Sequence, residues 1–158
     1  MVYSFKLAVF DLDDTLWNGE ELFRDTKNIL TTLKSNGIPI YIASFHTGAL
    51  DACKSLNIDI YFNDILFGRD KTKHQMIMDI LKKHPDIQES DVVFYDDNLA
   101  NICDVQKNSQ IQTVHIGPDG LQWYHVNLFY YVSFNEFPDF FSTNYHLSDY
   151  ARIAKALC

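Results

Sequence analysis

Phe10-Asp11-Leu12-Asp13-Asp14-Thr15-Leu16 is the stretch that decides the fold of this 158-residue chain. It follows Leu7-Ala8-Val9-Phe10, a short apolar run of the kind that forms a strand buried on both faces. Three carboxylates therefore crowd into four residues where this strand ends. An acidic turn is the simple interpretation, since Asp is common in turns. Because crowded carboxylates repel one another and ligands bind at the carboxyl ends of parallel strands, the stretch favours a site that uses a cation.

Strand-like and helix-like segments alternate along the rest of the chain. Apolar runs predict strands at 7–10, 38–43, 91–95 and 112–116 and a short strand after an irregular approach within 58–67, and helices are expected at 21–35, 48–56, 72–84 and 99–107. This alternation predicts an α/β fold: a Rossmann-like, doubly wound, mostly parallel sheet with helices on both faces. Asn18-Gly19 predicts a tight turn, and with it a small flap over the acidic stretch.

Composition favours a single domain over residues 1–158 with a sizeable core, since 47% of the residues are hydrophobic. The formal net charge of −8 argues against a nucleic-acid partner, because phosphate backbones need a basic surface. The sequence shows no apolar run of membrane-spanning length and no signal peptide, so we expect a cytoplasmic protein without membrane contact. Cys53, Cys103 and Cys158 lack CxxC spacing and predict reduced thiols.

The segment 121–141 is crowded with aromatic residues. The favoured interpretation is that the C-terminal segment 121–158 packs on the domain, with a last helix at 148–157. The alternative is an exposed aromatic surface for a partner or for a homo-oligomer.

Polar side chains follow the other predicted strands. Ser44 and the pair Asp96-Asp97 each come directly after an apolar run, and Lys71 lies in a loop that opens a helix. Mg²⁺ prefers carboxylates, water and phosphate oxygens, a serine hydroxyl can donate to a phosphoryl oxygen, and a lysine adds positive charge. Together with Asp11, these residues predict Mg²⁺-dependent phosphate chemistry in which a carboxylate attacks phosphorus.

The pattern resembles a known family. Asp11-Leu12-Asp13-Asp14-Thr15 matches the DxDxT motif of the haloacid dehalogenase superfamily, and Ser44, Lys71 and Asp96-Asp97 resemble its other three motifs in the family's order. Within that superfamily the sequence is most similar to the magnesium-dependent phosphatase-1 group. It departs from that group at Phe45-His46, where an Arg often follows the motif serine.

The resemblance implies a role for each matched residue. Asp11 would be the nucleophile and a Mg²⁺ ligand. Asp13 would be the general acid and then the general base, with its backbone carbonyl facing the metal. Family members that preserve the aspartyl-phosphate carry Thr at the second position, so Asp13 favours a hydrolase.

The remaining matched residues would bind phosphate or metal, or support the site. Thr15 would brace the loop, and Ser44 and Lys71 would hold the phosphoryl group. Asp96 would ligate Mg²⁺, with Asp97 as a further ligand or as support for it.

Three assignments near the site stay open. Lys73 competes with Lys71 as the phosphate lysine; Lys71 is preferred, because His74 then falls where the resembling group has a His. A packing role is favoured over a catalytic one for His74. His46 lies beside Ser44 and could contact substrate.

The segments between the motifs are too short to hold a cap domain. An open site fits a phosphoprotein, another large substrate, or small sugar and metabolite phosphates. Two hypotheses from other classes are a receiver-like phospho-Asp signalling module and a non-catalytic binding module that docks through its aromatic C-terminal segment. The motif order argues against the first, and the intact set of site residues argues against the second.

Overall fold

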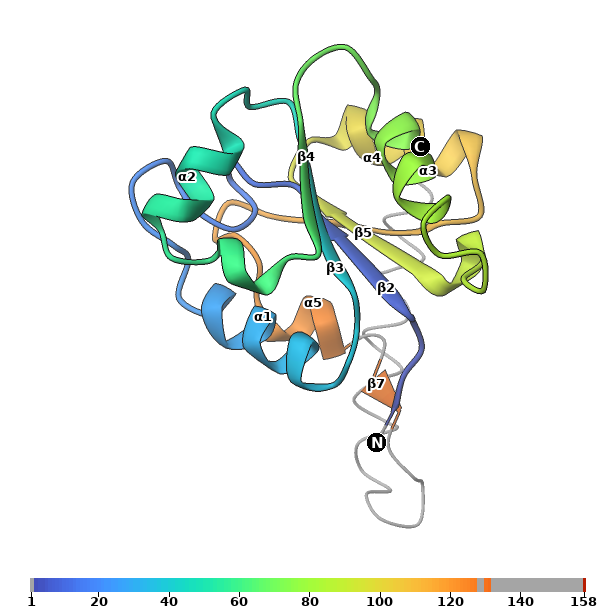
Figure 1. Ribbon diagram of the computed structural model, residues 1–158, viewed down its shortest axis with the longest axis horizontal. Coiled ribbons are helices and arrows are strands. Elements are labelled where there is room, and N and C mark those ends of the chain that lie inside the picture. The colour runs from blue at the N-terminus through green and yellow to red at the C-terminus, as the bar shows by residue number, and fades with distance from the viewer. Residues whose placement is uncertain (1, 128–129, 132–157) are drawn as a thin grey trace.

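Five parallel strands form the central sheet of the computed structural model, which describes residues 2–127, 130–131 and 158 (Figure 1). Their order across the sheet is β4-β3-β2-β5-β6. The strands are β2 (Leu7–Phe10), β3 (Ile40–Ser44), β4 (Asp64–Phe67), β5 (Val92–Asp96) and β6 (Gln112–His115). The predicted fold class, a doubly wound α/β sheet, is confirmed.

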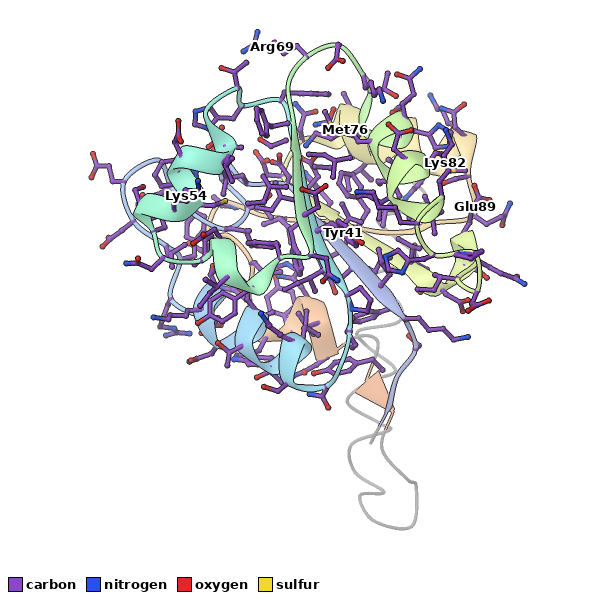
Figure 2. The ribbon with its side chains drawn as sticks, in the orientation of Figure 1. Tyr41, Lys54, Arg69, Met76, Lys82 and Glu89 are labelled. Carbon is purple, nitrogen blue, oxygen red and sulfur yellow. A yellow bond between two sulfur atoms is a disulfide. The ribbon has the colours of Figure 1, made fainter. Side chains whose placement is uncertain are left out.

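Helices cover both faces of this sheet. They are α1 (Thr26–Ser35), α2 (Ala49–Ser55), α3 (Lys73–Leu81), α4 (Leu99–Asn108) and α5 (Trp123–Asn127), with short 3₁₀ helices η1 (Asp59–Tyr61) and η2 (Glu89–Asp91). Side chains of α1, α2 and α5 join one hydrophobic core, and those of α3 and α4 join a second core on the opposite face. Met76 of α3, labelled in Figure 2, is buried in the second core.

The side chains of strand β2 are buried on both faces of the sheet. Ala8 and Phe10 belong to the first core, and Leu7 and Val9 belong to the second. Successive side chains of a strand point to opposite faces, so an unbroken apolar run is what a strand covered on both faces requires.

The expected helix at 21–35 begins only at Thr26, because the residues before it form the flap. The side-chain oxygen of Asn18 accepts hydrogen bonds from the backbone of Glu20 and Glu21, both at 2.9 Å. Trp17 forms isolated β-bridges with Asp13 and Leu22. The tight turn predicted at Asn18-Gly19 thus closes a small hairpin-like flap that follows directly on the acidic stretch.

Asp14 lies in the left-handed region with φ of 59°, and its N–H donates to the carbonyl of Trp17 at 2.8 Å. Asp is one of the residues that tolerate this conformation. Asp14 is therefore a turn residue at the base of the flap.

The turn before α5 packs on the flap through Gly120. This glycine has φ of 73°, and a Cβ placed on it would lie 2.1 Å from the ring of Phe23, so a larger residue cannot stand here. The next residue, Leu121, is buried and donates its N–H to the carbonyl of Thr15 at 2.8 Å. The C-terminal part of the described chain thus supports the loop that carries the acidic stretch.

The structure describes only the start of the aromatic segment and the pair Tyr130–Tyr131. Trp123 packs against the first core and Tyr124 is exposed. The residues Tyr130–Tyr131 form strand β7, which pairs antiparallel with β1 (Val2–Tyr3). The other aromatic residues after Asn127 and the expected helix at 148–157 lie outside the described residues, so the packing of the whole segment stays a prediction.

The expectation of three reduced thiols is wrong in this structure, because Cys103 of α4 forms a disulfide with Cys158. Cys53 remains a free, buried cysteine, as expected. The two partners are 55 residues apart, and a pairing at that distance leaves no local pattern in the sequence. Among the described residues there is no helix long and apolar enough to cross a membrane.

The buried His125 makes stability sensitive to acid. Its Nδ1 accepts a hydrogen bond from the backbone of Gln122 at 3.0 Å, and burial lowers its pKa from 6.5 to about 4. As the pH falls below 6.5, His125 of the unfolded chain binds a proton, whereas His125 of the folded chain stays neutral until about pH 4. The free energy of unfolding therefore falls as the pH falls from 6.5 to about 4. Urea unfolding at pH 7 and pH 5 should show a smaller loss for His125→Asn than for the wild type. Equal losses would contradict this account.

Candidate active site

Two carboxylates meet at the point where the order of the strands along the sheet reverses. The chain places β3 and β4 on one side of β2 and β5 and β6 on the other, so β2 and β5 are neighbours at the topological switch point. Asp11 follows β2 directly, and Asp96 is the last residue of β5. The N–H of Asp11 donates to the carbonyl of Tyr95 at 2.9 Å, which continues the strand pairing to the site.

Lys73 joins the ends of three strands. Its ammonium donates to Asp11 Oδ1 at 2.7 Å, to Asp96 Oδ2 at 3.1 Å and to the carbonyl of Ala43 in β3 at 2.6 Å. The side chain is 1% exposed, so these contacts replace its hydration. Lys73 is the first residue of α3, directly after the N-cap Thr72.

The structure places Lys73, and not the preferred Lys71, against the buried carboxylates Asp11 and Asp96. Lys71 lies in the loop before α3, 48% exposed, where it forms an ion pair with Asp79. The capping box in which Thr72 and Gln75 exchange hydrogen bonds separates the two lysines: one precedes the cap and the other begins the helix. A Thr-x-x-Gln pattern is visible in the sequence and could have decided between them.

Asp96 is held by donors from the start of α4. Its Oδ1 accepts the N–H of Asn98 at 2.8 Å, and its Oδ2 accepts Asn101 Nδ2 at 3.0 Å as well as the ammonium of Lys73. Asn98 also caps α4 by accepting the N–H of Ala100. Asn101 is a supporting residue that the sequence interpretation did not include. Asn101 lies in the first turn of the helix that follows Asp96, and this position in the sequence could have indicated a contact between the two side chains.

Thr15 and Ser44 are both buried at the site. Thr15 Oγ1 lies 3.5 Å from Asp11 Oδ2, which suits the bracing role expected of it. Ser44 ends β3, next to the carbonyl that Lys73 binds, and its Oγ accepts the N–H of His46 at 3.1 Å.

Asp13 lies apart from the buried carboxylates. Its side chain is 50% exposed, with Oδ1 accepting Trp17 Nε1 at 2.7 Å and Oδ2 lying 3.4 Å from His46 Nδ1. The structure therefore brings His46 to Asp13. His74 is placed differently: its backbone N–H donates to Asp104 Oδ2 at 3.2 Å, which fixes the start of α3 against α4.

Asp11, Asp96 and Asp97 form an acidic cluster in which one carboxylate oxygen from each lies within 4.8 Å of the others. Burial raises the pKa of Asp11 to about 8, against the opposing effect of Lys73 and with a further upward contribution from Asp96. Burial also raises the pKa of Asp97. The ammonium of Lys73 contacts two of these three carboxylates, those of Asp11 and Asp96, and hard oxygen ligands of this kind suit Mg²⁺. The carboxylate of Asp13 does not join this cluster.

The fold and this site together define a phosphatase with the haloacid dehalogenase-like fold. The chain belongs to the acid phosphatase family, whose model matches residues 18–128, well over half of its length. A comparison with curated proteins finds no match.

Solved structures share the fold at low sequence identity. A haloacid dehalogenase-like hydrolase, SP0104 from Streptococcus pneumoniae, is 15% identical with a TM-score of 0.62, over 78% of this chain and 90% of that one. The Mg-complexed phosphatase domain of BF1531 from Bacteroides fragilis is 21% identical with a TM-score of 0.65, over 82% of this chain and 42% of that one. The 3-deoxy-D-manno-octulosonate 8-phosphate phosphatase from Moraxella catarrhalis, solved with magnesium and phosphate, is 22% identical with a TM-score of 0.55, over 76% and 71%.

If the acidic cluster binds Mg²⁺, the ion stabilises the folded chain. Binding at a hundredfold excess over Kd contributes about 2.7 kcal/mol, which raises the unfolding temperature by several degrees. We expect Mg²⁺ to raise Tm relative to EDTA, and Asp97→Asn to reduce the increase. Asp79→Asn, which removes a half-buried carboxylate that pairs with Lys71 outside the cluster, should leave the increase unchanged. An equal increase in all three proteins would contradict a site at the cluster.

Proposed function

We propose that the chain is a Mg²⁺-dependent phosphomonoester hydrolase that works through an aspartyl-phosphate on Asp11. The supporting observation is the position of Asp11 at the switch point, with one oxygen on the buried ammonium of Lys73 and the other beside Thr15. We also propose that it is a capless member of the magnesium-dependent phosphatase-1 group, on the motif resemblance and the short flap.

In the first step, a carboxylate oxygen of Asp11 attacks phosphorus and the bond from phosphorus to the leaving oxygen breaks. Asp13 gives its proton to that oxygen. Lys73 and Ser44 are the groups that would hold the phosphoryl oxygens. An ammonium can donate three hydrogen bonds, and Lys73 donates to three acceptors in this structure. To bind a phosphoryl oxygen, Lys73 must therefore give up one of these three hydrogen bonds.

In the second step, water attacks the phosphorus of the aspartyl-phosphate, and Asp13, now a carboxylate, takes a proton from that water. The bond between phosphorus and Asp11 breaks, and both aspartates return to their starting states. The sum is a phosphomonoester plus water giving an alcohol and inorganic phosphate.

Asp11, Asp96 and Asp97 would hold Mg²⁺, together with the backbone carbonyl of Asp13. When bound, the ion supplies positive charge that lets an anionic carboxylate approach an anionic phosphoryl group. Asn98 and Asn101 keep Asp96 in place for this purpose.

A cavity beside the site offers room for the leaving group. It measures about 550 Å³, in the range of small-ligand pockets, and is lined by Phe45, Arg69, Asp70, Lys71, Thr72 and Gln75. The ring of Phe45 lies 4.9 Å from the ammonium of Lys73, so one wall of the cavity borders the phosphate site. Figure 2 shows Arg69 at the outer edge, on the loop between β4 and α3. This cavity favours a small sugar or metabolite phosphate, with a phosphoprotein as the alternative.

The receiver-like alternative is disfavoured by the sheet. Numbered along the chain, the five parallel strands lie in the order 3-2-1-4-5, whereas receiver domains of the flavodoxin-like type have the order 2-1-3-4-5. Association through the aromatic C-terminal segment, as a homo-oligomer or a binding module, stays a separate proposal that sedimentation analysis can test.

Hydrolysis of p-nitrophenyl phosphate tests the proposed function. Asp11→Asn should lower turnover at least about a thousandfold, because loss of the nucleophile removes the first step, and EDTA should abolish turnover in the wild type. Asp14→Asn is the matched control, since Asn also tolerates the left-handed turn position that Asp14 occupies. Full activity in Asp11→Asn, or turnover that ignores EDTA, would refute the proposal.

The two lysines give a second test. Lys73→Met should abolish turnover and lower the stability of the fold by about 3 kcal/mol or more, because it leaves two buried carboxylates without their partner. Lys71→Met removes an exposed pair and should keep near-normal turnover and stability. The opposite order of effects would restore Lys71 as the phosphate lysine.

A further inference from the structure

The carboxyl group of Asp13 is contacted from two sides by two different loops. Trp17, in the flap, donates its indole N–H to Oδ1 at 2.7 Å. His46, in the loop between β3 and α2, places Nδ1 3.4 Å from Oδ2. Each carboxyl oxygen thus faces one ring nitrogen.

Trp17 is itself held in place. Its backbone forms bridges with Asp13 and Leu22, and its carbonyl accepts the N–H of Asp14 at 2.8 Å. Its half-buried ring packs against the first hydrophobic core. The direction of the indole N–H is therefore set by the flap and the core together.

His46 is also fixed by its loop. Its N–H donates to Ser44 Oγ at 3.1 Å, and its carbonyl accepts the N–H of Ala49 at 3.1 Å. A Cβ placed on Gly48 would lie 3.3 Å from His46 Nε2, so the glycine leaves room for the imidazole ring. The same serine that would hold phosphate therefore also orients the histidine that reaches Asp13.

We propose that Trp17 and His46 are positioning residues that fix the Asp13 carboxyl group for proton transfer to the leaving oxygen, an inference that rests on the proposed role of Asp13. Asp13 is half exposed, and a short exposed side chain without such contacts samples several rotamers. A general acid acts only when it is held within reach of the leaving oxygen. The hydrogen bond from Trp17 holds Oδ1, and the imidazole of His46 lies beside Oδ2 without a hydrogen bond, so the two rings together limit the orientations of the carboxyl group.

The test compares two substrates that differ in their need for an acid. The p-nitrophenolate group leaves readily without a proton, whereas the alkoxide of glycerol 2-phosphate needs one. The ratio kcat/KM reports the step in which the phosphoryl group is transferred to the enzyme. Trp17→Phe should lower kcat/KM for glycerol 2-phosphate about tenfold more than for p-nitrophenyl phosphate. This factor is smaller than the full contribution of a general acid, because Asp13 itself is still present. His46→Ala should act in the same direction, and His46→Asn, with a side-chain amide near the position of Nδ1, should restore part of the loss.

Trp123→Phe is the matched control, because Trp123 packs on the same core without contact to Asp13. It should leave the ratio of the two kcat/KM values unchanged. Equal losses for both substrates in Trp17→Phe, no loss, or faster turnover would overturn the inference. Faster turnover would mean that the two rings hold Asp13 away from the substrate.

The variant Asp13→Asn separates this inference from the proposed function. If Asp13→Asn shows the leaving-group selectivity and Trp17→Phe does not, the acid assignment stands and the positioning role fails. If Asp13→Asn loses equally on both substrates, the acid assignment itself fails.

A spectroscopic readout is independent of turnover. The chain has two tryptophans, so its NMR spectrum holds two indole N–H signals, and Trp123→Phe assigns them. Asp13→Asn should shift the Trp17 signal and leave the Trp123 signal in place. An unmoved Trp17 signal would contradict the contact on which the inference depends.

Discussion

The buried ammonium of Lys73 is the interaction on which the rest of the site depends. It binds groups from the ends of β2, β3 and β5, so it both neutralises two buried carboxylates and ties together three strands at the switch point. Leaving these charges without a partner would cost several kcal/mol, whereas the closed set of contacts makes their burial tolerable. Burial raises the pKa of Asp11 to about 8 despite the opposing effect of Lys73, and Asp96 adds to the rise; a divalent cation at this cluster would oppose both effects.

The surrounding structure serves to place that ammonium and its partners. The capping box at Thr72 starts α3 at Lys73, Asn98 and Asn101 hold Asp96, and Thr15 lies beside Asp11 in a loop that Leu121 supports from the C-terminal side. Asp13, by contrast, faces solvent between Trp17 and His46. The site thus has a rigid, buried half suited to phosphate and metal and a half-exposed part suited to proton transfer.

Sequence reasoning located those residues whose position follows from a strand. Asp11, Ser44 and Asp96 come at the ends of buried apolar runs, and such ends meet at one edge of a parallel sheet, so their neighbourhood was predictable. Lys73 was considered but not preferred, because the choice between the two lysines depends on where α3 begins, which the Thr72–Gln75 capping box decides. Periodicity carries no information about contacts between segments that are far apart in the chain. Three such contacts are that of His46 with Asp13, the pairing of β1 with β7, and the Cys103–Cys158 disulfide.

The proposed reaction requires that the phosphoryl group passes through the carboxylate of Asp11. Acid quenching during turnover of p-nitrophenyl phosphate, followed by mass spectrometry of the peptide that contains Asp11, tests it most directly. Asp13→Asn should slow the attack of water and let the intermediate accumulate. We predict one phosphoryl group on Asp11 in that peptide and none in Asp11→Asn. Continued turnover with phosphate on a different residue, or with no phosphorylated peptide in either protein, would contradict the account.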